Sequence, residues 1–459
     1  MRQKRLDMCH GPMLLPMLSY ALPIFGANVL QRLFIAIDII LASHLGTSGS
    51  DAIAAVGSTT SLTSLLLGFF IGCATGSAVS VSHALGSGNR ALTQKTVHTA
   101  MLLSVVIGAV IMATGLCVSR PVLTAMHTPP HVLKLSTAYL NMYFTGMIPS
   151  MVYNFSAAIL RAAGETRKPL FFLMISGPAK LLLTILFVSV CKMDVVGLAL
   201  ANTLSTTISA TLSVTILCRR TDDCKLELKN LRFHAGPMKK ILALGIPSGI
   251  QSATFSLSGV IVQSSVNSLS HLDGFITGNS AAASIEGFAE AITGAFHTVA
   301  LNFAGQNTGA KDYGRVKRSC ITACALCSAC ILIVSPLVLL FDNQLLALYI
   351  PDSPQAIYWG TVRMTFIFGP LLFQGFMDTA SGTLRGIGAS FSGMVVNLLG
   401  ICGFRILWLL IVFPIPQYHT PQCLYIVYPI TWILTTIVQV LLFGFFLRKK
   451  QAALQRAAA

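Results

Sequence analysis

Charged side chains are scarce in this chain: aspartate, glutamate, lysine and arginine together make up 10% of its 459 residues. A soluble domain carries about 25% charged residues, because its surface must be hydrated. Hydrophobic residues make up 54% of this chain, and its mean hydropathy is +0.74. Leu102–Cys117 and Ile331–Phe341 contain no acid and no base. These features exclude an ordinary soluble fold and predict a protein embedded in a lipid bilayer.

Several other signals are missing. Strand-like alternation of polar and apolar residues is absent, so helices are the expected way to satisfy the backbone in lipid. No Walker loop, metalloprotease motif or nucleophile elbow is present, which argues against an enzyme and against a bound cofactor. The basic N-terminus leads into a long apolar stretch without a cleavage site, so we expect a retained first helix. Four of the twelve cysteines form a helical stripe, which we interpret as helix packing and not as a metal site: Cys320, Cys324, Cys327 and Cys330.

Apolar runs between glycine, proline and charged residues predict an all-α polytopic membrane protein with twelve spanning helices. Each run is long enough to cross a hydrocarbon core of about 30 Å. The expected spans are 14–42, 52–85, 96–118, 135–160, 169–190, 195–218, 241–268, 275–306, 316–341, 354–384, 390–413 and 425–447.

Lysine and arginine lie mainly on one side of these spans. The termini and the loops on their side hold 24 of the 31 basic residues, whereas the opposite loops hold only Arg120, Lys134 and Lys192. Because cytoplasmic loops are enriched in basic residues, we expect both termini in the cytoplasm. The net charge of +16 is therefore a signal of topology, and we expect no nucleic-acid partner.

Three landmarks recur at a nearly constant separation, which indicates an internal duplication. Pro23 matches Pro247, Gly86 matches Gly309, and Leu160–Gly164 matches Leu384–Gly388. Each half has six spans, so the repeats are parallel, as in transporters that alternate access by rocking. We expect lobes at 1–224 and 241–459, joined by a cytoplasmic linker at 225–240.

The ordered motifs of the chain resemble the multidrug and toxic compound extrusion (MATE) transporters, in particular the bacterial branch of the DNA-damage-inducible protein F group. The resemblance covers essentially the whole chain. It rests on Gln31–Asp38 with Leu45–Gly46, Ile53–Gly57, Leu160–Pro169, Ile285–Phe288, Gln306–Ala310 and Leu384–Gly388.

This resemblance implies efflux of organic, often cationic, compounds that is driven by an inward H⁺ or Na⁺ gradient. It also implies that Asp38 is the acidic residue of the first helix that couples cation movement to transport. Charged groups at membrane depth are rare and usually functional. Asp38 lies inside the expected first span, 14–42, which agrees with such a role.

Lys180 departs from the pattern of this branch, where the middle of the fifth span is commonly polar and uncharged. Thr184 follows one turn later. We expect Lys180 to pair with Asp38, although a lysine that extends to the membrane surface is the simpler alternative. A nearby cation lowers the pKa of a carboxylate and competes with Na⁺ for it.

The second lobe has its own charges in predicted spans. Glu286 and Glu290 lie one helical turn apart and share a face, so a cation or a shared proton is expected to relieve their repulsion. Asp378 and Arg405 are further candidates, and we favour Arg405 as the partner of one acid over direct contact with substrate. The other candidate residues of the cavity are uncharged: Gln31, Asn154 and Asn202.

These observations predict a cation-coupled antiporter for small organic compounds, a monomer in the bacterial inner membrane. One alternative is a flippase for lipid-linked precursors from the same wider superfamily, although such flippases often have additional spans and a cation-rich cavity. The other alternative is a receptor or scaffold that transports nothing, against which the duplicated lobes and the buried charges of both signs argue.

Overall fold

The computed structural model describes residues 6–45, 49–126 and 128–458. These residues form helices and loops, with no β-strand. Only the backbone is described at 35–36, 38–45, 49–54, 56, 58, 60–61 and 457–458.

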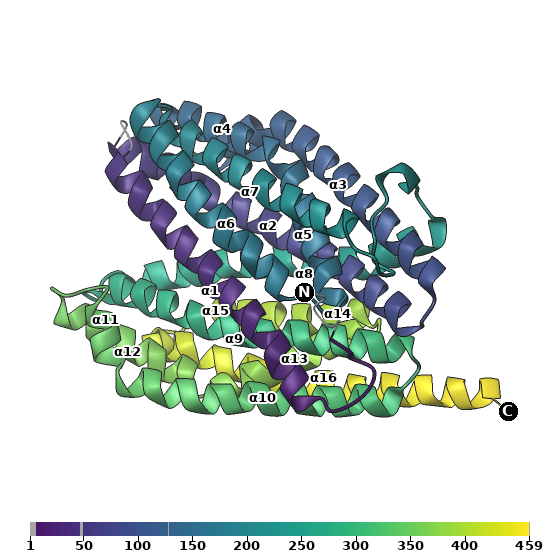
Figure 1. The fold of residues 1–459 in the computed structure, drawn as a ribbon. Helices are drawn as coiled ribbons and strands as arrows, with labels where there is room; N and C mark the ends of the chain where they lie inside the picture. The colour runs from purple at the N-terminus through teal and green to yellow at the C-terminus, as the bar shows by residue number, and fades with distance from the viewer. Residues whose placement is uncertain (1–5, 46–48, 127, 459) are drawn as a thin grey trace. The chain divides into compact units, whose positions relative to one another are not determined.

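The first half of the chain forms long helices that pack side by side (Figure 1). Two of the predicted spans combine two segments: α4 is followed directly by α5, and α6 continues into a short π-helix, η1. The elements are α1 (Leu14–Leu45), α2 (Gly49–Gly86), α3 (Arg90–Ala125), α4 (Pro130–Thr145), α5 (Met147–Ala162), α6 (Arg167–Thr184), η1 (Ile185–Val190), α7 (Asp194–Cys218) and the short η2 (Leu228–Asn230).

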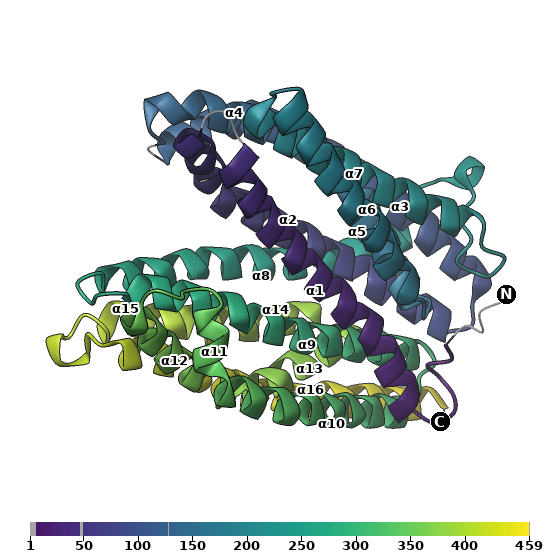
Figure 2. The same ribbon diagram turned by 60° about the vertical axis from the view of Figure 1, so that its left-hand side comes forward.

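The second half follows the same plan, and its helices are seen from another side in Figure 2. Its elements are α8 (Ala235–Ser268), α9 (Phe275–Gly309), α10 (Tyr313–Leu340), α11 (Asp342–Ala347), α12 (Pro354–Phe368), α13 (Leu371–Gly386), α14 (Ser390–Asn397), η3 (Leu398–Gly403), α15 (Phe404–Ile411), η4 (Pro416–Tyr418) and α16 (Pro421–Ala458).

Every predicted span coincides with one helix or with two or three consecutive helical segments. Over the described residues, eight helices are long and apolar enough to cross a membrane, and the pair α12–α13 makes a ninth if it is counted as one broken span. This pair bends by 48°. The remaining predicted spans correspond to α4–α5, whose two helices have 16 residues each, and to α8 and α9. Many exposed side chains are large and apolar, such as Leu340 and Leu441, in agreement with contact to lipid.

The duplication is also visible in the local backbone. Gly164 and Gly388, which occupy equivalent places in the two repeats, both have a positive φ, of 86° and 87°. Asn89 and Asp312 are likewise equivalent, and both cap the helix that follows by accepting a hydrogen bond from a backbone N–H three residues later. The same turn chemistry at the same offset explains why these landmarks are found in both halves of the sequence.

Contacts divide the chain into two compact units, and neither is one continuous stretch. Unit 1 comprises residues 1–6 and 26–249, and unit 2 comprises 7–25 and 250–459. The first part of α1 therefore belongs to unit 2, and the first part of α8 belongs to unit 1. The chain passes from one unit to the other within α1 and within α8. These two places are equivalent in the repeat, because each follows shortly after a matched proline, Pro23 or Pro247. The predicted lobes at 1–224 and 241–459, with a linker at 225–240, remain a prediction.

Within unit 1, the first part of α8 packs closely against α2 through glycine. A Cβ atom added to Gly72 would lie 2.4 Å from the backbone nitrogen of Gly249, and one added to Gly76 would lie 2.3 Å from the backbone oxygen of Ile241. Small residues allow membrane helices to approach in this way.

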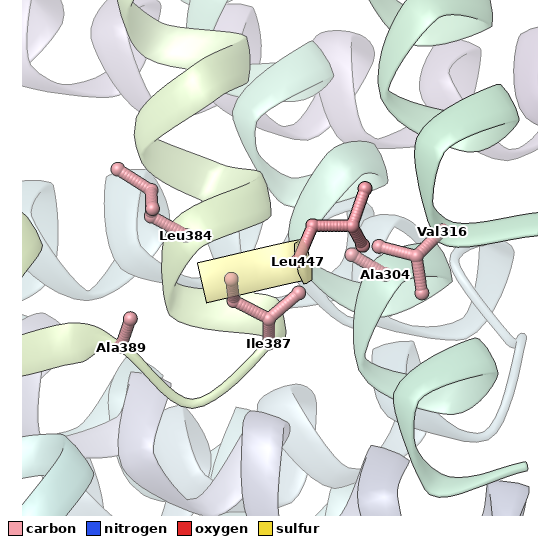
Figure 3. Packing of buried hydrophobic residues seen from close by; sticks show 6 residues of the cluster. All are labelled: Ala304, Val316, Leu384, Ile387, Ala389 and Leu447. Carbon is pink, nitrogen blue, oxygen red and sulfur yellow. The ribbon is translucent and has the colours of Figure 1, made fainter. Parts of the chain in front are cut away.

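Within unit 2, the residues of the matched landmark of the second repeat form part of an apolar core. Leu384 and Ile387, at the end of α13, pack with Ala304 of α9, Val316 of α10 and Leu447 of α16 (Figure 3). This cluster joins four helices, so the recurring Leu-Arg motif has a packing role in the fold.

Candidate functional site

A buried ion pair lies inside unit 2. Glu286 of α9 accepts a hydrogen bond from the guanidinium of Arg363 of α12, with 2.5 Å between Oε2 and Nη2. Each residue is 7% exposed. A buried charge is costly unless it is paired, so these two side chains stabilise each other at membrane depth.

Two further polar groups complete this ion pair. Asn279, two helical turns before Glu286 on α9, accepts hydrogen bonds at Oδ1 from Arg363 Nη1 at 2.7 Å and from the hydroxyl of Tyr425 at 2.9 Å. Asn279 and Tyr425 are buried. The guanidinium also lies over the ring of Tyr425, with 5.5 Å from Cζ to the ring centroid. Three helices, α9, α12 and α16, are thereby joined by one polar network.

Arg405 of α15 does not pair with an acid, which corrects our expectation. Its guanidinium lies over the ring of Tyr428, with 4.1 Å from Cζ to the centroid, and Nη2 donates to Thr431 Oγ1 at 3.4 Å. Across the described side chains, no carboxylate forms an ion pair with it. Arg363, in the middle of α12, is the neutralising cation instead. The sequence feature that could have identified Arg363 is its position inside an apolar span.

The other two acids of unit 2 differ from Glu286. Glu290, one turn later on α9, is exposed. Contrary to our expectation, the two glutamates therefore do not share one buried environment. Asp378 of α13 is half-buried, and its backbone carbonyl accepts a hydrogen bond of 2.9 Å from His297 Nδ1 of α9. This bond fixes the tautomer of His297 with its proton on Nδ1.

In unit 1, α1 and α6 run side by side in the same direction. Gly26 of α1 lies against Leu170 of α6, and Phe34 of α1 covers Gly177 of α6 so closely that a Cβ there would be 1.7 Å from the ring. Lys180, half-buried, follows Gly177 by three residues. Asp38 follows Phe34 by four residues in α1, and its side chain lies outside the described residues.

The uncharged candidates of unit 1 lie on four different helices. Thr184, at the end of α6, is fully buried. Asn154 donates to the carbonyl of Ser150 within α5, and the carbonyl of Asn202 accepts bonds from Ser205 and Thr206 within α7. Gln31 of α1 is exposed. The described hydrogen bonds of these residues stay within their own helices, so the structure does not join them into one network.

The loop motif after α5 forms an ion cluster outside the membrane-spanning segments. Arg220, after α7, contacts Glu165 at 2.9 Å and Asp222 at 2.5 Å, and Lys168 also contacts Glu165. Burial alone would lower the pKa of Arg220, but the hydrogen bond to Asp222 and the charge of Glu165 outweigh it and raise this pKa above its usual value. This ion cluster fastens the motif of the first repeat to the end of α7.

The cysteine stripe lies along α10, where its members range from buried to half-buried. In the part of the chain that the structure describes, no group of three histidine, cysteine, aspartate or glutamate side chains could hold a metal ion.

A model of the MatE family matches the chain twice, at residues 23–186 and 247–411. The two matches begin at the two matched prolines, Pro23 and Pro247, in agreement with the duplication predicted from the landmarks. Together they cover most of the chain.

Individual proteins are similar over nearly the full length. A Bacillus subtilis protein named probable multidrug resistance protein YpnP is 26% identical over 408 residues, which are 88% of this chain and 89% of the relative. The crystal structure of a MATE protein in complex with MaL6 has a TM-score of 0.90 at 17% identity, covering 98% of this chain and 100% of that one. An outward-facing multidrug resistance MATE family transporter of the MOP superfamily also has a TM-score of 0.90 at 17% identity, covering 98% and 99%. These structures share the fold of this chain.

Proposed function

The chain belongs to the MatE family, and from this premise we propose that it is a multidrug efflux transporter that exports small organic compounds in exchange for H⁺ or Na⁺. A member of this family is a membrane carrier and not an enzyme. The observation that carries the proposal is the family match to both halves of one all-helical membrane protein. The multidrug resistance name of the Bacillus subtilis relative supports the class of substrate. Within the family, we place the chain in the branch of the DNA-damage-inducible protein F group.

We propose that coupling takes place in unit 1, between α1 and α6. The contacts of Gly26 with Leu170 and of Phe34 with Gly177 support this site, because they set the two helices in parallel register. Asp38 and Lys180 each follow the second contact by about one helical turn, so they occupy neighbouring levels of adjacent helices. A lysine here favours the ionised carboxylate and competes with an incoming cation.

This coupling site predicts a specific effect of removing the lysine. In Lys180→Ala, the proposed site loses a competing cation, so the pH profile of transport is expected to shift to higher pH. The measurement is the initial efflux rate in proteoliposomes between pH 5.5 and 8.5. Lys134→Ala, which removes an exposed lysine near the start of α4, is the control. A profile that is identical in wild type and Lys180→Ala would contradict the pairing.

We further propose that the protein is a monomer in the bacterial inner membrane, with both termini in the cytoplasm. The uneven distribution of lysine and arginine supports this orientation, with 24 basic residues on the side of the termini and 3 in the opposite loops. The polar groups of unit 2, chiefly Glu286, Arg363 and Arg405, are the proposed contribution of the second lobe to substrate binding.

The decisive experiment is flux in a purified system. Full-length protein is reconstituted in liposomes loaded with ethidium, and release is followed while a H⁺ or a Na⁺ gradient is imposed in separate arms. We expect release to accelerate with one of the two gradients and to stop when an ionophore dissipates it. Parallel arms use an organic anion in place of ethidium. If neither compound moves with either gradient, export is contradicted and the flippase alternative is favoured.

A further inference from the structure

Arg405 in unit 2 is a cation at membrane depth that no acid among the described side chains neutralises. It lies six residues, about 9 Å, before the end of α15. The buried network around it contains two arginines, Arg363 and Arg405, and one carboxylate, Glu286, which is committed to Arg363. The network therefore has one excess positive charge. Such a charge in a membrane span is rare and usually serves a ligand or a partner.

The side chain of Arg405 is held mainly by aromatic contact. Its guanidinium stacks on Tyr428 at 4.1 Å, and its one described hydrogen bond, to Thr431, is long at 3.4 Å. Nε is buried without a hydrogen-bond partner. A guanidinium has five N–H donors, so most of its donor capacity is unused, and its planar edge suits a carboxylate or a phosphate.

Extension to the membrane surface does not explain this arrangement. An arginine that snorkels points its charged end toward water. The charged end of Arg405 instead covers Tyr428, which is 9% exposed and lies seven residues, about 10 Å, inside α16. The guanidinium is therefore stacked on a largely buried ring.

Tyr428 is the ring in contact with this cation, and other aromatic residues lie near these two residues in α15 and α16. Tyr428 makes an edge-to-face contact with Trp432, at 6.0 Å between centroids, and Phe404 beside Arg405 stacks on Trp408 at 6.2 Å. Aromatic surfaces beside a cationic hydrogen-bond donor fit a flat ligand with an anionic substituent.

We propose that Arg405 and Tyr428 form a binding site for the anionic group of aromatic substrates, so that unit 2 selects aromatic carboxylates. This inference rests on the proposed export function and names a substrate class for it. The guanidinium edge binds the carboxylate, and the neighbouring rings contact the aromatic body. The Glu286–Arg363 pair keeps Glu286 away from Arg405, which leaves this cation available to the ligand.

The test uses three ligands with one ring system and different charge: 2-naphthoate, 2-naphthylmethylammonium and 2-naphthalenemethanol. Binding to the purified full-length protein is measured by calorimetry in nanodiscs. The variants are Arg405→Gln and Arg405→Lys, and the control is Arg448→Gln, the same substitution at an exposed position of α16. Thermal unfolding of each variant verifies that it is folded.

We expect Arg405→Gln to weaken the binding of 2-naphthoate by about tenfold or more, since a charge-assisted hydrogen bond is lost. The affinities for the ammonium and the alcohol should change by less than about twofold. Arg405→Lys should retain part of the affinity, because the charge remains without the planar edge. Arg448→Gln should bind like wild type.

Three results would overturn the proposal. The first is equal binding of 2-naphthoate by wild type and Arg405→Gln, and the second is a parallel loss of all three ligands. The third is that phosphatidylglycerol in the nanodisc competes with 2-naphthoate at Arg405 and abolishes its binding. This result would assign the site to a lipid headgroup. Because binding is measured without a gradient, failure of export in the flux experiment is a separate outcome.

Discussion

At the scale of single residues, the buried charges of unit 2 depend on one another. Glu286 neutralises Arg363, while Asn279 accepts hydrogen bonds from both Arg363 and Tyr425. The sequence located Glu286 as an intramembrane acid, because charges stand out in apolar spans. It did not identify its partner, since Arg363 and Arg405 are both single arginines in apolar spans. Only the packing of α12 against α9 decides between them.

Removal of the acid from this pair is expected to destabilise the protein. In Glu286→Gln, Arg363 is left buried without a counter-charge, which typically costs about 3–5 kcal/mol. The melting temperature in detergent should fall well below that of wild type. A second change, Arg363→Met, should recover much of the loss, because the uncompensated charge is then gone.

Asp352→Asn, which removes an acid from an exposed loop, is the matched control and should melt like wild type. If Glu286→Gln and Asp352→Asn melted at the same temperature, the pair would have no stabilising role. A double variant less stable than Glu286→Gln would also contradict this account.

At the scale of elements, hydropathy placed every spanning segment, because the thickness of the bilayer fixes the length of an apolar helix. The sequence did not reveal where spans are broken, as between α4 and α5 or α12 and α13. It also did not reveal that α8 approaches α2 through facing glycines. Gly72, Gly76 and Gly249 lie in ordinary helical stretches, so nothing in the local pattern distinguishes them from glycines that face lipid.

The glycine contact between α2 and α8 predicts a steric effect. In Gly76→Ala, the added methyl group meets the backbone of Ile241 and Gly245, which cannot move as a side chain can. We expect a loss of stability of about 1–3 kcal/mol, as for other overpacked contacts. Thermal unfolding in detergent measures it.

Gly57→Ala on the same helix is the control, because a Cβ atom at that position has nothing within 4 Å. Alanine is the better helix former, so this control should be as stable as wild type or slightly more stable. Equal melting temperatures for the two alanine variants would mean that α2 and α8 are not in close contact.

At the scale of the whole molecule, the two units depend on each other for parts of their helices. Unit 2 includes residues 7–25 from the beginning of the chain, and unit 1 includes the start of α8 up to residue 249. Within unit 2, Asn307 donates to the backbone oxygen of Met8 at 3.0 Å, and Tyr20 packs edge-to-face on Phe303 at 5.8 Å. The matched prolines indicate the repeat in the sequence, but a repeat alone does not reveal this exchange.

The exchange predicts how the protein behaves when its chain is divided. If fragments 1–230 and 231–459 are expressed together, each supplies a helix segment that the other unit needs, so they should purify as one complex in detergent. Fragment 231–459 expressed alone should give little folded protein, because residues 7–25 are missing from unit 2. Co-expression with 26–230, which lacks the same segment, should recover much less complex than co-expression with 1–230. The measurement is the yield of both fragments after affinity purification through a tag on 231–459, followed by size-exclusion chromatography. A monodisperse 231–459 that melts at the same temperature with or without 1–230 would mean that unit 2 is complete without the beginning of α1.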